Sequence, residues 1–181
     1  MTKPAPSSLE VLKAANPLAR LDNARMARHS ALSGVLAGVI LAVVTGMGAL
    51  SVHLERAAFL AEFERSLGNH PRREALEGQG ELFLNLTLAF GIGLTVLFAV
   101  LSFVQSRRLG WGVPIVFALF ALFPLPGRVG DLLQGQASSF GLVSLALYLV
   151  VALVSIAAFR GGLYLHRHDA VLQPPSPPAH D

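Results

Sequence analysis

Cysteine is absent from all 181 residues of the sequence. Its absence excludes disulfide cross-links, thiolate metal sites and thiol redox chemistry, and with them the four-span thiol oxidases and the claudin-type proteins. Lysine is also scarce, with two residues against twelve arginines. Together with abundant alanine, leucine and glycine, this bias indicates a bacterial, GC-rich coding sequence.

Charged residues are few and unevenly placed. They make up 14% of the chain and hydrophobic residues 53%, whereas an ordinary soluble domain has about 25% charged residues. Four windows, which together hold 80 residues, contain no Asp, Glu, Lys or Arg. As helices they approach or exceed the ~30 Å thickness of the hydrocarbon core of a bilayer. The sequence therefore predicts an all-α polytopic membrane protein, a four-transmembrane-helix bundle with spans at about 31–50, 82–104, 109–125 and 140–159.

The predicted spans divide the chain into three regions. Residues 1–30 form a basic segment, residues 31–159 form the membrane domain, and residues 160–181 form a proline-rich tail. The window 109–125 is the weakest span, because its closing Pro-Leu-Pro sequence gives a sharp helix stop. A re-entrant segment is the alternative for this window, and the charge pattern favours a full span.

Basic residues predict the side of the membrane on which each loop lies. Four spans put both termini on one side, and that side carries nine Lys and Arg residues against five on the other. Because loops rich in Lys and Arg stay in the cytoplasm, we predict that both termini are cytoplasmic and that the membrane is the bacterial cytoplasmic (inner) membrane. The same bias explains a pI near 10.0, so no nucleic-acid partner is expected.

The segment 51–81 is the sizeable piece predicted outside the membrane, on the side opposite the termini. No Gly or Pro separates Leu50 from Leu67, so helix is expected to continue beyond the first span. Phe59, Phe63 and Leu67 recur every four residues, with acidic residues and arginines between them, which is typical of an amphipathic helix. Two interpretations stay open: an interfacial helix lying on the bilayer, or a docking surface for a protein partner.

Small residues recur at every fourth position in the first two spans. Such stripes let helix backbones approach closely in lipid, where no hydrophobic drive acts between helices. We predict that the two stripes pack together within one monomer, and homo-oligomerisation through the first stripe is the alternative. The stripes are Gly34, Gly38, Ala42 and Gly46 in the first span and Thr87, Gly91, Thr95 and Ala99 in the second.

No acidic, basic or histidine side chain lies in the four windows, which argues against a proton-coupled pump. The uncharged polar residues Asn85, Thr87, Thr95 and Ser144 are the candidates for lining a solute path. The only metal-ligand pattern worth noting is His166, His168 and Asp169 after the last span. Residues two apart on a helix point to different faces, so we interpret this pattern as part of a basic cluster and predict no metal, cofactor or catalytic residue.

These features favour a non-catalytic membrane protein, an accessory, assembly or regulatory subunit of a membrane complex. It would contact lipid, and a protein partner through 51–81 or the membrane helices. The alternative is an oligomeric channel or transporter for a neutral or apolar solute. A membrane enzyme acting on lipids is a third interpretation, supported only by the carboxylates of 51–81.

Overall fold

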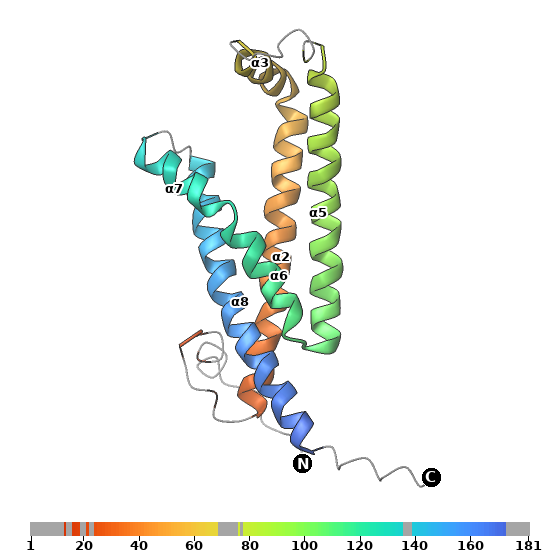
Figure 1. Ribbon diagram of the computed structural model, residues 1–181, viewed down its shortest axis with the longest axis vertical. Helices are drawn as coiled ribbons and strands as arrows, with labels where there is room; N and C mark the ends of the chain where they lie inside the picture. The colour runs from red at the N-terminus through yellow and green to blue at the C-terminus, as the bar shows by residue number, and fades with distance from the viewer. Residues whose placement is uncertain are drawn as a thin grey trace, which may run out of the picture. The chain divides into compact units, whose positions relative to one another are not determined.

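The protein consists of helices and short connections in the part of the chain that its structure, a computed structural model, describes (Figure 1). There is no β-strand within that part, so the all-α prediction is confirmed. Most of the N-terminal segment and the proline-rich end of the tail lie outside it. The described residues are 24–68, 78–135 and 139–172, together with Lys13, 16–18, Leu21 and Leu76.

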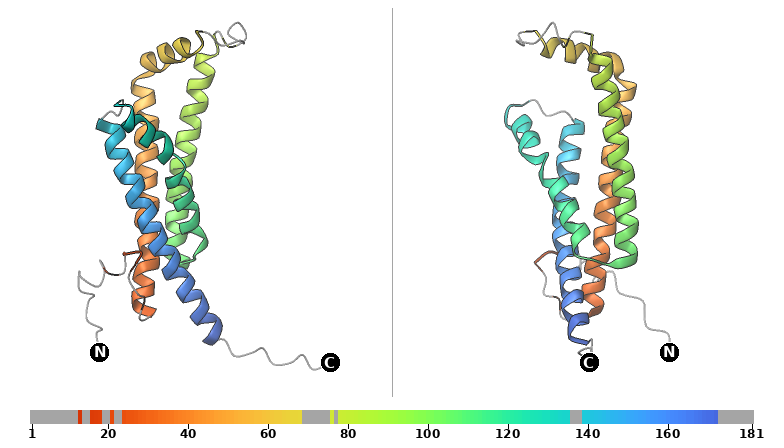
Figure 2. Two further views of the ribbon diagram at one scale, coloured as in Figure 1. Left: turned by 60° about the vertical axis from the view of Figure 1, so that its left-hand side comes forward. Right: turned by 45° about the vertical axis from the view of Figure 1, so that its right-hand side comes forward.

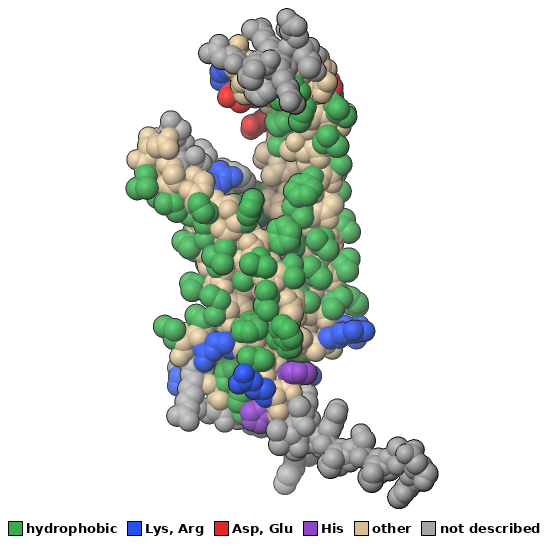
Figure 3. All heavy atoms as spheres, viewed as in Figure 1, with side chains coloured by type: hydrophobic (Ala, Val, Ile, Leu, Met, Phe, Trp, Pro, Cys, Tyr) green, Lys and Arg blue, Asp and Glu red, His purple; other side chains and the backbone are tan. Residues whose placement is uncertain are grey.

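Four helical stretches among the described residues are long and apolar enough to cross a membrane, which agrees with the predicted number. Long apolar side chains are exposed along these stretches, as expected where the surrounding solvent is lipid (Figure 3). The stretches are α2 (Ala24–Leu54), α5 (Gly80–Arg108), the pair α6 (Gly112–Leu122) and α7 (Leu125–Leu133), and α8 (Ser139–Leu172).

The helices α2, α5 and α8 are longer than the charge-free windows. Helix α2 begins at Ala24, within the predicted basic segment, and α8 continues to Leu172, within the predicted tail. A charged residue ends a window but not a helix, because Arg and Glu are good helix formers. The charge-free windows therefore locate the apolar part of each helix but do not locate its ends.

The chain divides into two compact units, and the division passes through α2 and α5. Unit 1 comprises Met1–Ile40 and Leu101–Asp181, and unit 2 comprises Leu41–Val100. In unit 1, α6 runs along α8 (Figures 1 and 2). The core of unit 1 is built mainly from small side chains around one large ring: Ala27, Ala31, Ala37, Ala121, Ala157, Ala158 and Phe117.

Helix α6 is shorter than the predicted third span. It has 11 residues and ends at Leu122, and the nine-residue α7 follows a turn at Phe123 and Pro124. At about 1.5 Å per residue, α6 alone covers roughly half of the ~30 Å hydrocarbon core. Pro124 and Pro126 lack the backbone N–H that a continuous helix uses, so the break falls where they occur. Charge counting does not predict the separate helix α7.

In unit 2, the second part of α2 runs beside the first part of α5 (Figures 1 and 2). Helix α2 ends at Leu54, because Glu55 leaves the helical conformation with φ −101° and ψ 29°. Helix α3 (Arg56–Ser66) follows directly and stops before Gly68. The helix expected beyond the first span is thus present, as an element distinct from α2.

Candidate functional site

Buried polar side chains tie α5 to α2 in unit 1. The Ser102 hydroxyl donates a hydrogen bond to the carbonyl oxygen of Val35 at 2.9 Å, and Gln105 Nε2 donates to that of Ala31 at 3.0 Å. Both donors are buried, and Gln105 is 0% exposed. Because the two acceptors lie one helical turn apart, the bonds fix the antiparallel register of the two helices. We call Ser102 and Gln105, together with Ser30 and Ser33 of α2, the polar seam.

Serines extend the polar seam from α2 to α8. Ser30 Oγ donates to the carbonyl oxygen of Ala157 at 2.7 Å. Ser33 Oγ lies 2.7 Å from the carbonyl oxygen of Ser30 and 3.3 Å from that of Val154. A hydroxyl that bonds to a carbonyl of the neighbouring helix satisfies its donor where lipid offers no water.

Gly161 marks the closest approach between α2 and α8. A Cβ atom at this position would lie 2.5 Å from both the carbonyl oxygen of Ala27 and the amide nitrogen of Ala31. The neighbouring Gly162 lies against the backbone of Gly110 and Trp111, which form the turn between α5 and α6. Both glycines are therefore required by contact with backbone atoms, those of α2 at Gly161 and those of the turn between α5 and α6 at Gly162.

Two buried side-chain polar atoms of unit 1 have no hydrogen-bond partner in the described chain, Gln105 Oε1 and Ser155 Oγ. Both residues are completely buried. An unsatisfied buried polar group costs about 1–3 kcal/mol. These two atoms are therefore the places where an added hydrogen-bond partner would most stabilise the packed helices.

The polar seam is not predictable as a site from the sequence alone. Gln105 lies one residue beyond the second charge-free window and two residues before Arg107, in a stretch that resembles a connection between spans. A usable signal was present in α8, where Ala157 with Gly161 and Ala158 with Gly162 repeat the small-x-x-x-small spacing of close helix pairs.

In unit 1 the small-residue stripe of α2 meets three helices. Gly34 lies against Ala158 of α8 and Gln105 of α5, and Gly38 is covered by the Phe117 ring of α6. The prediction that this stripe packs against α5 is therefore incomplete in unit 1, because the stripe also contacts α6 and α8. A helix has 3.6 residues per turn, so a stripe with a spacing of four rotates by about 40° at each step and changes partner.

In unit 2 the two stripes do meet. Gly46 lies against Thr95, and a Cβ atom at Gly91 would approach Ala49 Cβ to 2.9 Å. The hydroxyls of Thr45 and Thr95 are 3.1 Å apart, at hydrogen-bond distance. Small residues and one hydroxyl pair thus hold α2 against α5 at this level.

The other residues of the predicted stripes contribute less. Thr87 and Ala99 are exposed on α5, and Ala42 is half-buried on α2. The Thr87 hydroxyl donates to the carbonyl oxygen of Phe83 at 2.8 Å, within its own helix. The α5 stripe therefore contacts α2 through Gly91 and Thr95 rather than along its whole length.

The candidate solute-lining residues bond mainly within their own helices. Asn85 and Thr87 are exposed, and Ser144 is buried with its hydroxyl donating to Gly141 at 2.9 Å. Thr95 Oγ1 lies 2.8 Å from the carbonyl oxygen of Gly91. Beside Thr95, unit 2 has a groove of about 330 Å³ that is otherwise lined mostly by apolar residues: Gly46, Ala49, Leu50, His53, Leu88, Ile92 and Val96.

Of the three candidate metal ligands, the structure describes the side chains of His166 and His168. His166 and His168 are exposed on α8, and the side chain of Asp169 lies outside the described residues. The His168 ring stacks on Tyr164 with centroids 4.0 Å apart, and its Nδ1 lies 2.9 Å from the Tyr164 carbonyl oxygen. Within the described chain, no group of three His, Asp or Glu residues is arranged to hold a metal ion.

Helix α3 is fixed against the start of α5 within unit 2. The rings of Phe63 and Phe83 have centroids 4.9 Å apart, and Leu60 and Phe63 lie against Gly80. Arg56 pairs with Glu81 at 2.5 Å, and this hydrogen bond raises the pKa of Arg56. The pair is exposed and contributes little energy, so the apolar contacts provide most of the attachment.

The chain matches no protein-family model, no curated protein and no solved structure.

Proposed function

We propose that the protein is a non-catalytic subunit of a membrane complex, with an accessory, assembly or regulatory role, and that α3 is its docking surface for a protein partner. This is supported by the packing of the apolar face of α3 against the start of α5. Phe63 is half-buried, with Gly80 and Phe83 of α5 against it, and Leu67, which caps α3, is 7% exposed.

The competing interpretation of α3 is an interfacial helix. Such a helix binds a bilayer by inserting its apolar face into the lipid. In α3 that face is turned to α5, whereas Ala61 and Arg65 on the opposite face are exposed. A fixed face of small and charged side chains is better suited to a protein, where charge complementarity gives specificity.

A photoreactive amino acid placed at Ala61 tests the proposal in native membranes. We expect ultraviolet light to link Ala61 to one recurring heterologous protein, identified by mass spectrometry. The Phe63→Ala variant should lower the yield, because it removes a ring contact worth about 0.5–1.5 kcal/mol that fixes α3. The matched control is the same probe at Phe90, which is 68% exposed on α5 and should capture lipid. Capture of lipid alone at Ala61 would instead support the interfacial helix.

The proposal includes a location in the bacterial cytoplasmic membrane with both termini in the cytoplasm. It is supported by the excess of Lys and Arg on the terminal side of the four candidate spans. A reporter that is active only outside the cytoplasm should be silent when fused after Asp181 and active when inserted at Gly68. The reverse pattern would show that the orientation is inverted.

A further inference from the structure

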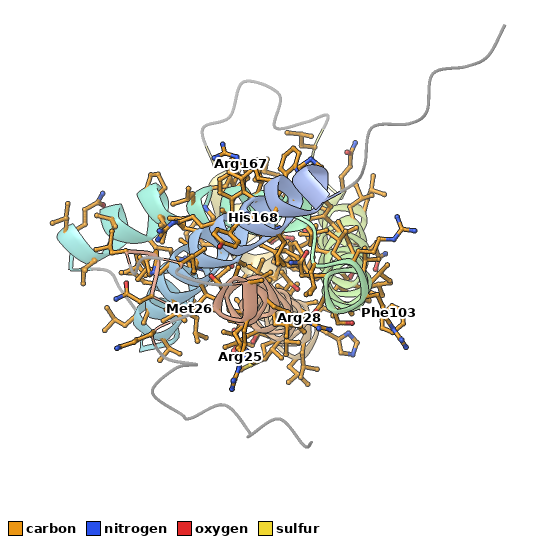
Figure 4. All side chains as sticks on the ribbon, turned by 90° about the horizontal axis from the view of Figure 1, so that it is seen from below. Arg25, Met26, Arg28, Phe103, Arg167 and His168 are labelled. Carbon is orange, nitrogen blue, oxygen red and sulfur yellow. The ribbon has the colours of Figure 1, made fainter. Side chains whose placement is uncertain are left out.

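The first turns of α2 and the last turns of α5 lie side by side in unit 1. The hydrogen bond from Gln105 to Ala31 sets their register. Arg28 lies three residues before Ala31 and Arg107 two residues after Gln105, so both arginines stand at the same level of the helix pair. Figure 4, which looks along this end, shows Arg28 and Phe103 on the side of the pair that faces away from α8.

Both arginines border exposed apolar surface. The Arg107 guanidinium carbon lies 5.2 Å from the centroid of the Phe103 ring, and Phe103 is 60% exposed. On α2, Leu32 and Leu36 follow Arg28 at one and two helical turns, and both are exposed. A cationic edge thus adjoins an apolar strip on each helix.

No described acidic side chain in unit 1 offsets these charges. The ion pairs Arg56–Glu81 and Glu62–Arg65 lie in unit 2. Arg28 and Arg107 are exposed and form no ion pair within the described chain. Figure 3 likewise shows basic side chains gathered at this end of unit 1.

We propose that Arg28, Arg107 and Phe103 form a binding site for an acidic phospholipid. The two guanidinium groups bind the headgroup phosphate, since their planar donor forks match its oxygen atoms. The acyl chains lie along Phe103 and the strip of Leu32 and Leu36. This combination selects a lipid over a soluble phosphate, because the apolar strip contributes only when the anion carries hydrocarbon. Basic positions between helices on the cytoplasmic side are typical sites for anionic lipids.

Native mass spectrometry of the purified full chain in mild detergent tests the site. We expect phosphatidylglycerol to stay bound under conditions that remove phosphatidylcholine, and glycerol phosphate not to displace it. The double variant Arg28→Gln/Arg107→Gln should reduce retained phosphatidylglycerol about tenfold, because each basic residue near the headgroups adds to the attraction. The matched control is Arg108→Gln/Arg167→Gln, which removes the same charge from exposed residues of the same unit and should retain the lipid.

A third variant, Phe103→Ala, keeps every charge and should also lower retention by removing the apolar contact. Retention of tertiary structure is checked for each variant by its thermal midpoint, and Phe103→Ala provides the decision if the double variant unfolds. Equal losses in the two double variants would show a diffuse electrostatic attraction and overturn the site. Displacement by glycerol phosphate would show an anion site instead. Equal retention of phosphatidylcholine would show that the headgroup charge is not recognised.

Discussion

Replacing Gly161 by alanine is expected to lower the thermal midpoint of the purified protein by roughly 3–10 °C. The added Cβ would lie 2.5 Å from the Ala27 carbonyl oxygen and the Ala31 amide nitrogen. These are backbone atoms of α2 and have no rotamer that moves them aside. The two helices must therefore separate, and overpacking of this kind costs about 1–3 kcal/mol. Separation would also lengthen the hydrogen bond from Ser30 to Ala157.

Two glycines with open space around them, Gly48 on α2 and Gly93 on α5, provide the control. A Cβ atom at Gly48 or Gly93 would meet no heavy atom of the described chain within 4 Å. Because alanine is favoured over glycine in a helix by up to about 1 kcal/mol, Gly48→Ala and Gly93→Ala should leave the midpoint unchanged or slightly raised. Scanning fluorimetry in one detergent compares the three variants. Equal midpoints for all three would mean that α2 and α8 are not closely packed at Gly161.

The charge-free windows predict the four apolar helices well, for a physical reason. A charged side chain at the centre of a span is costly, so about 20 residues without charge are a strong signal by themselves. The ends of the helices are not predictable in this way, since Arg and Glu on either side of a window are compatible with helix. The break at Pro124 is readable from the sequence, but the new helix α7 after it is not.

The partners of each helix face were much harder to predict. A spacing of small residues shows that a face can approach another helix, but it does not identify that helix. Gly34 and Gly38 meet α8 and α6 in addition to α5, and only the folded chain shows this. The sequence around Gln105 is polar because Arg107 and Arg108 follow it closely, although its own side chain turns inward and is 0% exposed. For α3, the amphipathic pattern was clear, but the attachment of its apolar face to α5 was not.

Replacing Gln105 by glutamate is expected to destabilise the protein by about 3–5 kcal/mol near neutral pH. The change preserves the shape of the side chain and removes the Nε2 donor that bonds to Ala31 at 3.0 Å. An ionised carboxylate would then face a carbonyl oxygen, with no described cation in contact and no exposure to solvent. A buried charge without a partner is among the most destabilising single changes.

The pH dependence of Gln105→Glu has a defined sign. Burial disfavours the ionised form, so the folded state holds the proton more tightly than the unfolded chain, whose glutamate titrates near about 4.3. Stability of the variant should therefore fall as pH rises above that value and recover as pH is lowered, since the neutral acid can donate to Ala31. Chemical unfolding at several pH values, with the wild-type chain as reference, measures this slope.

Gln105→Leu separates the effect of the charge from that of the lost hydrogen bond. Leucine also lacks the donor, but it removes the unpartnered Oε1 atom. The lost hydrogen bond and the relieved unsatisfied acceptor are each of order 1 kcal/mol and opposite in sign, so this variant should stay within about 1 kcal/mol of the wild type. A glutamate variant no less stable than the leucine variant at neutral pH would mean that water reaches Gln105. In that case the polar seam would be an aqueous site between α2 and α5 rather than a dry structural contact.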